Sequence, residues 1–144
     1  MSEANKVLVR RYFDEILNKS DLTLVPEIFS HDSVFCAPHM PEIRGHEARK
    51  LFITAIHTTY PDIHYTIQEL IAEGDKVVAR WKYSGTHKGE WMGTKPTGKH
   101  FTATGTTTLR ISGGKIVEEW ADYDALGVWQ QLGVLPALGH GQKG

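Results

Sequence analysis

The sequence predicts an α+β protein, with helices in its first part and an antiparallel sheet in its second. Up to Pro61, apolar residues recur every three or four positions, as on the buried face of a helix. Beyond Pro61 they alternate with polar residues, as in strands that bury one face, and glycine-containing turns separate the alternating segments. Helices followed by an antiparallel meander are typical of the α+β class.

The first helix is indicated by Val9, Phe13 and Ile16, which follow i, i+4, i+7 spacing. A short helix is expected over 24–29, since proline is tolerated in a first turn, and a short strand over 33–37.

The stretch 45–62 gives the clearest helical pattern, and Pro61 ends it. Its buried face is expected to be one apolar stripe, formed by Ala48, Leu51, Phe52, Ala55 and Ile56.

Four strands are expected after this helix, at 63–68, 76–87, 100–111 and 115–123. The glycine-rich segment 88–99 is predicted to be a loop. Residues 124–133 suit a closing helix with Asp124 as its N-cap. A twisted sheet of this size cannot cover its own apolar face, so the helices should pack against it and leave a conical cavity. One domain is expected over 1–138, followed by a flexible tail over 139–144.

Composition excludes several classes of function. Sixteen basic and seventeen acidic residues give a net charge of −1, which offers no basic surface for nucleic acid. No apolar run approaches the roughly 20 residues that a membrane span needs. The first residues lack the pattern of a secretory signal, and the one cysteine, Cys36, cannot form an internal disulfide. These features favour the cytoplasm.

Four segments resemble the SnoaL-like polyketide cyclases of the NTF2-like superfamily. They are VRRYFDEI, the YPD after the long helix, SGTHKGEWMGTKPTGKHF and GGKIVEEWADYDALGVWQQLG, and the resemblance extends from Lys6 to Gly133. It implies a cone in which a curved antiparallel sheet wraps over the N-terminal helices and encloses a hydrophobic cavity. It also implies a homodimer and an intramolecular aldol ring closure that needs no metal or organic cofactor.

The same resemblance points to an acid/base aspartate on the last strand, within a His-Trp-Asp pattern. Laid on this sequence, that pattern falls on Glu119, Trp120 and Ala121, so alanine occupies the position of the family's aspartate. A pocket histidine of the cyclases falls on Thr107. His39 lies where the family's pocket rim runs.

Alternation decides which acids of the last strand can face the cavity. If Ala121 faces inward, so do Glu119 and Val117, while Asp122 faces out. Glu119 is therefore the first candidate for a general acid or base, with a carboxylate at the cavity mouth, or one paired with an arginine, as the structural alternative. Asp122 is a catalytic candidate only if a bulge turns it inward.

Aromatic residues supply the candidate ligand contacts. Trp81, Tyr83 and Phe101 should lie on the inner face of the sheet, where they stack on a flat ligand or simply fill the core. Trp91, in the glycine-rich loop, is expected either to cover the cavity or to anchor the loop. The histidines show no HxxxH or HExxH spacing and there is no Cys/His cluster, so no metal site is expected.

Three functions remain open. The first is a cofactor-independent acid/base enzyme of cyclase, isomerase or dehydratase type that acts on a hydrophobic, carbonyl-bearing small molecule. The second is a non-catalytic protein that binds such a molecule, because Ala121 replaces the family's aspartate. The third is a structural dimerisation module. A threonine-rich outer sheet face suits contact with a second subunit; it comprises Arg80, Lys82, Thr102, Thr104, Thr106, Thr108 and Arg110.

Overall fold

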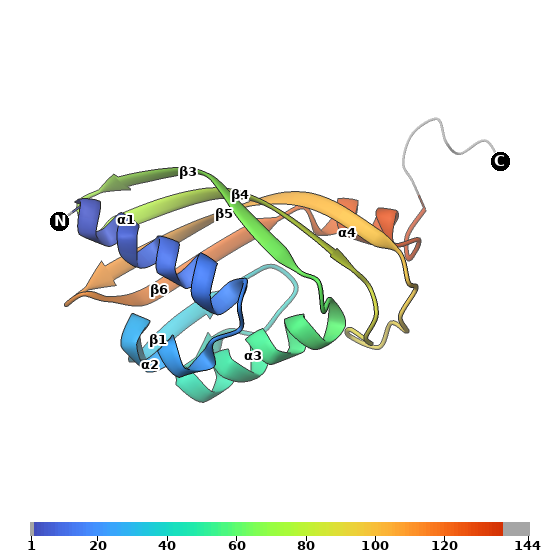
Figure 1. Ribbon diagram of the computed structural model, residues 1–144, viewed down its shortest axis with the longest axis horizontal. Coiled ribbons are helices and arrows are strands. Elements are labelled where there is room, and N and C mark those ends of the chain that lie inside the picture. The colour runs from blue at the N-terminus through green and yellow to red at the C-terminus, as the bar shows by residue number, and fades with distance from the viewer. Residues whose placement is uncertain (1, 137–144) are drawn as a thin grey trace.

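A curved sheet forms one layer of the molecule. The computed structural model describes residues 2–136, and six strands in them pair in the order β2-β1-β6-β5-β4-β3. The strands are β1 (Phe29–Cys36), β2 (Ile43–Arg44), β3 (His64–Glu73), β4 (Lys76–Thr86), β5 (His100–Ser112) and β6 (Lys115–Tyr123). Figure 1 shows the sheet arching over the helices without closing into a barrel. The α+β class is confirmed; the expected tail over 139–144 lies outside the described residues.

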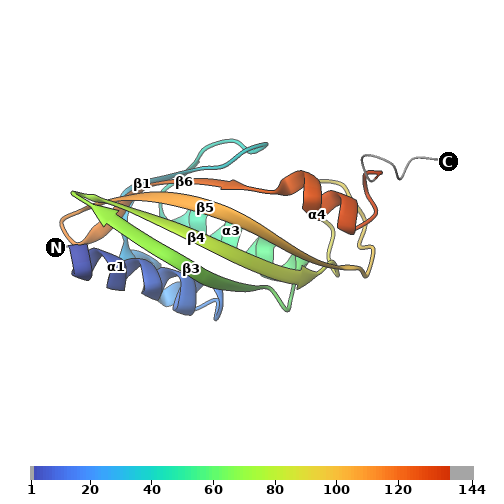
Figure 2. The same ribbon diagram turned by 90° about the horizontal axis from the view of Figure 1, so that it is seen from above.

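The helices that precede β3 form the second layer, beneath the concave side of the sheet, and the C-terminal helix lies at the end of the sheet, beyond β6 (Figure 1 and Figure 2). They are α1 (Ser2–Arg11), which continues into the π-helical turn η1 (Tyr12–Leu17), the 3-10 turn η2 (Leu22–Leu24), α2 (Val25–Ile28), α3 (His46–Thr59) and α4 (Ala125–Gln131). Seen from above, α1 and α3 lie on the same side of the sheet (Figure 2). Within residues 2–136, no helix is long and apolar enough to span a membrane.

The sheet combines an antiparallel meander with one parallel pair. Strands β3 to β6 follow one another as antiparallel neighbours, as predicted, and β1 lies parallel to β6. The short helix ends at Ile28, so the strand expected at 33–37 is longer and begins at Phe29. Strand β2, two residues long, was not expected from the sequence.

The prediction for the buried face of α3 was correct for Ile56 and wrong for Leu51, while Ala48, Phe52 and Ala55 are half-buried. The helix buries Arg49, Ile53, Ile56 and Thr59, while Leu51 is 71% exposed. The inward face thus includes an arginine and a threonine, and an apolar count passes over both. The predicted apolar stripe is therefore rotated around the helix axis relative to the face that is buried.

The alternation in β6 is interrupted near its start. Glu119 and Ala121 are buried as expected, but Ile116 is buried in place of Val117. The cause is a register shift against β5, where Arg110 pairs with Glu118 and the next residue, Ile111, pairs with Ile116. The strand therefore bulges at Val117, before the acidic residues and not at Asp122.

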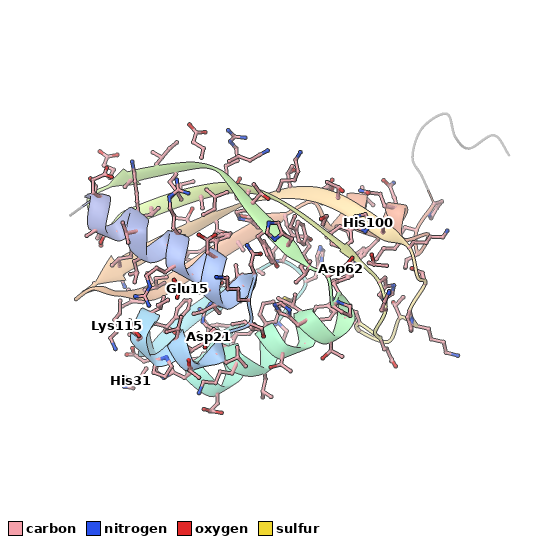
Figure 3. All side chains as sticks on the ribbon, in the orientation of Figure 1. Glu15, Asp21, His31, Asp62, His100 and Lys115 are labelled. Carbon is pink, nitrogen blue, oxygen red and sulfur yellow. The ribbon has the colours of Figure 1, made fainter. Side chains whose placement is uncertain are left out.

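At the end of the sheet near the loop 88–99, polar contacts hold the strand ends together. Asp62, just before β3, accepts hydrogen bonds from the backbone N–H and the hydroxyl of Thr86, both at 2.7 Å. The same hydroxyl lies 3.0 Å from Nδ1 of His100 at the start of β5. Figure 3 shows Asp62 and His100 near each other at this end. These contacts fix the strand ends from which the loop 88–99 departs.

Trp81 occupies the centre of the inner sheet face because β5 leaves space for it. Its register partner is Gly105, and a Cβ at that position would collide with the indole ring. The indole N–H donates to the hydroxyl of Thr107 at 2.8 Å, while the rings of Phe13, Tyr65 and Tyr83 surround it. The ring therefore cannot move aside.

Replacing Gly105 with alanine is expected to lower the free energy of unfolding by about 1–3 kcal/mol, because the added methyl overpacks the core against Trp81. Urea denaturation followed by tryptophan fluorescence measures the change. Thr106→Ala, at the exposed neighbouring position, serves as the control and should change stability by less than about 0.5 kcal/mol. Equal effects of the two substitutions would contradict the proposed collision.

Candidate functional site

Tyr12 enters the interior from the π-helical turn η1. Within this turn the N–H of Asn18 bonds to the carbonyl of Phe13 at 2.9 Å, five residues back, and the wider turn buries Tyr12, Phe13, Ile16 and Leu17. The side chain of Asn18 then donates to the carbonyl of Tyr65 at 2.9 Å and accepts from its N–H at 2.7 Å. The end of the helix is thus fixed to β3.

Three side chains from distant parts of the chain meet in the core. The hydroxyl of Tyr12 donates to the Glu119 carboxylate, 2.9 Å from Oε1 and 3.0 Å from Oε2. Arg49 Nη1 donates to Oε1 at 2.7 Å and lies 3.4 Å from the Tyr12 hydroxyl. The guanidinium also covers the ring of Phe29, with 3.8 Å between its central carbon and the ring centroid. We call Tyr12, Arg49 and Glu119 the buried triad.

The buried triad brings opposite charges together away from water. Arg49 and Glu119 are 2% and 3% exposed. Burial raises the pKa of the Glu119 carboxyl above its ordinary value, while the Arg49 cation and the hydrogen bonds from Arg49 and Tyr12 oppose this rise. Burial and the neighbouring Glu119 raise the pKa of Tyr12 well above its usual range, so the phenol keeps its proton and remains a donor.

A pocket of about 90 Å³ lies between the buried triad, the inner sheet face and the helices. Glu119 and Tyr12 contribute its polar wall on one side. Much of the remaining wall is aromatic and includes Phe35, Phe52, Tyr65, Tyr83, Trp91 and Trp129. A flat, largely apolar molecule with few polar groups matches such a wall.

Most of the residues expected to contact a ligand line this pocket. Trp81 and Tyr83 do so from β4, Thr107 from β5, and Glu119 and Ala121 from β6. The loop 88–99 contributes Trp91, whose backbone pairs with Thr94 across a tight turn. Because the hydroxyl of Thr107 already accepts from the Trp81 indole, its oxygen is partly occupied.

Three expected residues do not line the pocket. Phe101 is 1% exposed and packs edge-on behind Tyr83, with 5.0 Å between ring centroids, so it belongs to the core. His39 is exposed, and its ring lies 5.5 Å from that of Trp129, which itself lines the pocket. Asp122 is exposed on the outer sheet face, opposite Thr106, because β6 pairs regularly from Glu118 to Tyr123. The bulge in β6 is at Val117, so it does not turn Asp122 inward.

Sequence reasoning missed two members of the buried triad. An arginine partner for Glu119 was one of the alternatives considered, but nothing singled out Arg49. The spacing of residues along α3 could have indicated that Arg49 is buried, because Arg49 stands four and seven residues before Ile53 and Ile56, on the same face of the helix. Tyr12 adjoins Phe13 in the first helical stripe and carried no separate signal.

Comparison with known proteins identifies the family. The model of the SnoaL-like polyketide cyclase family matches residues 7–132. The chain belongs to this family. No match was found among curated proteins.

Solved structures of SnoaL-like and related proteins share the fold. IdmH from Streptomyces antibioticus, a proposed polyketide cyclase, is 30% identical, with a TM-score of 0.78 over 90% of this chain and 99% of IdmH. AclR from Streptomyces galilaeus, a proposed hydroxylase, is 27% identical, with a TM-score of 0.82 over 97% and 87% of the two chains.

A protein from Catenulispora acidiphila with a ketosteroid isomerase-like fold is 19% identical, with a TM-score of 0.75 over 89% of this chain and 93% of its own. At that identity the likeness concerns the fold alone. Together with the family match, it confirms the predicted NTF2-like architecture.

Removing one charge of the buried triad is expected to cost far more than removing the triad altogether. Arg49→Met leaves the Glu119 carboxylate buried without its cation, and should lower the free energy of unfolding by about 3–5 kcal/mol. The triple variant Tyr12→Phe/Arg49→Met/Glu119→Leu carries no buried charge, so it should lose less than the single variant. Urea denaturation measures both.

The surface pair of Arg80 and Glu69, 3.1 Å apart and half exposed, provides the matched control. Arg80→Met should change the free energy of unfolding by less than about 1 kcal/mol. If the triple variant of the buried triad were less stable than Arg49→Met alone, charge burial would not be the dominant factor.

Proposed function

We propose that this SnoaL-like protein is a cofactor-independent enzyme of cyclase, isomerase or dehydratase type. Its substrate class is a hydrophobic, carbonyl-bearing small molecule, and Glu119 is the acid/base. Membership of the family and the similarity to proposed cyclases support a cyclase- or isomerase-type function. The observation that carries the finer proposal is a carboxylate, buried in the core, at the wall of an aromatic pocket.

The contacts of Glu119 leave one of its oxygens able to react. Oε1 accepts from both Arg49 and Tyr12, whereas Oε2 accepts only from Tyr12 among the residues that the structure describes. A carboxylate has about four acceptor positions, so Oε2 can still take a proton. Burial raises the pKa of Glu119, which makes the carboxylate a stronger base than one in water.

The proposed step is a proton transfer at carbon. A C–H bond next to the substrate's carbonyl breaks, the proton moves to Glu119, and the electron pair passes to the carbonyl oxygen as an enolate. Glu119 then returns the proton to carbon or oxygen as the enolate reacts. Arg49 and Tyr12 hold the carboxylate in place throughout, so they act as positioning residues.

A second candidate function is binding without turnover. Two observations favour it: Ala121 stands where the family's aspartate is expected, and Arg49 lowers the basicity of Glu119 by pairing with it at 2.7 Å. A pocket that only carries a ligand needs the aromatic wall but no reactive acid. The two functions therefore differ in whether a bound ketone exchanges its α-hydrogens.

We also propose a cytoplasmic homodimer, joined through the outer sheet face. The exposed polar residues on β4 and β5, among them Arg80, Lys82 and Thr104, support this arrangement. Light scattering on the purified protein measures the mass, and a mass of one chain at micromolar concentration would contradict the dimer.

The probe for catalysis is 2-tetralone, a flat hydrophobic ketone with acidic α-hydrogens. The protein is expected to accelerate deuterium exchange at these positions in D₂O, followed by NMR, over buffer alone. Glu119→Gln should reduce this acceleration by about 10²-fold or more while 2-tetralone still quenches tryptophan fluorescence on binding. Binding without any acceleration by the wild-type protein would support the non-catalytic alternative.

Two further variants make the result interpretable. Asp122→Asn removes the other acid suggested by the sequence, and should leave exchange unchanged because Asp122 lies on the outer face. Since Glu119→Gln leaves Arg49 without its anion, Arg49→Met/Glu119→Gln tests whether an uncharged, folded site is also inactive. If Asp122→Asn abolished exchange and Glu119→Gln did not, the acid would be misassigned.

A further inference from the structure

The chain contains five tyrosines, and all five line the pocket. They come from separate elements: Tyr12 from η1, Tyr60 from the end of α3, Tyr65 from β3, Tyr83 from β4 and Tyr123 from β6. Packing alone does not require their hydroxyls, since phenylalanines such as Phe13 and Phe101 fill neighbouring positions in the same core.

Four of these hydroxyls have no hydrogen-bond partner among residues 2–136. Tyr12 donates to Glu119, but the described residues provide no hydrogen bond to the hydroxyl of Tyr60, Tyr65, Tyr83 or Tyr123. Nor are these four oxygens among the fully enclosed polar atoms that lack a partner, so each remains open to the pocket or to solvent. Polar groups near the interior normally have partners, and these four are free to bind one that enters.

The four rings gather around Tyr83. Its ring stacks on Tyr65 with 5.2 Å between centroids and an angle of 19°, and it meets the edge of Tyr123 at 6.3 Å. Tyr60 and Tyr83 both pack on Phe101, each at 5.0 Å. We call these four residues the tyrosine cluster.

The tyrosine cluster stays protonated at neutral pH. Burial, with a contribution from Tyr123, raises the pKa of Tyr60 to about 12. Burial also raises the pKa of Tyr65, Tyr83 and Tyr123. The Glu119 carboxylate adds to the rise at Tyr65, and Tyr65 adds to the rise at Tyr83. All four groups are therefore O–H donors, and what they lack is an acceptor.

The geometry of β6 separates Tyr123 from the acid, whereas Tyr65 lies close enough to Glu119 for the carboxylate charge to raise its pKa. Glu119, Ala121 and Tyr123 point to the same face of this strand, which pairs regularly from Glu118 onward. Tyr123 is four residues beyond Glu119, about 13 Å along the strand. The small side chain of Ala121 lies between them, so the floor of the pocket is open from one polar end to the other.

We propose that the tyrosine cluster binds an oxygen acceptor at one end of a flat, conjugated ligand, whose reacting carbon lies over Ala121 beside Glu119. The ligand then carries a second oxygen, as carbonyl or ionised enol, at the end away from Glu119. This inference rests on the proposed function, because it places that substrate in the same pocket. Tyr65, Tyr83 and Tyr123 are its specificity-determining residues.

The test compares two probes of similar shape, 2-naphthol and naphthalene, which differ by one oxygen. Binding to the full-length protein is followed by tryptophan fluorescence. Wild-type protein should bind 2-naphthol more tightly than naphthalene. Each of Tyr65→Phe, Tyr83→Phe and Tyr123→Phe should weaken 2-naphthol binding roughly two- to tenfold, as expected for one net hydrogen bond, and leave naphthalene binding unchanged.

The naphthalene measurement separates recognition from folding. A variant that damaged the pocket would lose both probes, and the hydroxyl inference would then be tested with Tyr65→Phe/Tyr123→Phe, which leaves the central Tyr83 in place. Equal affinity of the wild-type protein for the two probes, or Phe variants that discriminate as wild type does, would overturn the inference. Exchange of 2-tetralone by Glu119 could still proceed in that case. If the wild-type protein preferred 2-naphthol to naphthalene but did not accelerate deuterium exchange of 2-tetralone, only the acid/base proposal would be overturned.

Discussion

The structure depends on a buried ion pair that joins segments far apart in the sequence. Arg49 and Glu119 are 70 residues apart and lie at 2.7 Å, and Tyr12 reaches the same carboxylate from 107 residues away. Arg49 and Tyr12 come from the helical layer, and Glu119 comes from β6 in the sheet, so the contacts join the two layers of the fold. Leaving either charge unpaired in the core costs about 3–5 kcal/mol, so the pair favours the relative position of the two layers that joins them.

Such a pair adds little net stability, because desolvation offsets most of the attraction. Its effect is to specify one arrangement of helices against sheet. If Glu119 also moves protons, the residue that fixes the fold is the residue that reacts, and every protonation of Glu119 leaves Arg49 facing a neutral acid. Tyr12, which donates to both carboxylate oxygens, keeps the acid oriented in either state. The demands of stability and of reactivity therefore meet in one side chain.

The sequence was sufficient for much of the fold and for part of the site. Regular alternation placed Trp81, Tyr83 and Glu119 on the inner face, and local chemistry identified Asp124 as an N-cap, where it accepts from the N–H of Gly127 at 2.9 Å. Arg49 could not be assigned to the interior in this way. A charged residue is buried only when its partner arrives from elsewhere in the chain, and no local pattern records that meeting. Ala121 indicated a departure from the family pattern. Alternation along the strand predicts the face on which the nearby Glu119 lies, but it does not predict which residues contact Glu119.

The bulge at Val117 allows β6 to lose one residue without changing which side chains face inward. In a regular strand, losing one residue turns every side chain on one side of the deletion to the opposite face. Here Ile116 and Glu119 both face inward although three positions separate them, since the extra residue is absorbed between the two. A chain lacking Val117 would restore an unbroken ladder and keep both inward. Loss of this one residue would therefore leave Glu119 at the pocket wall.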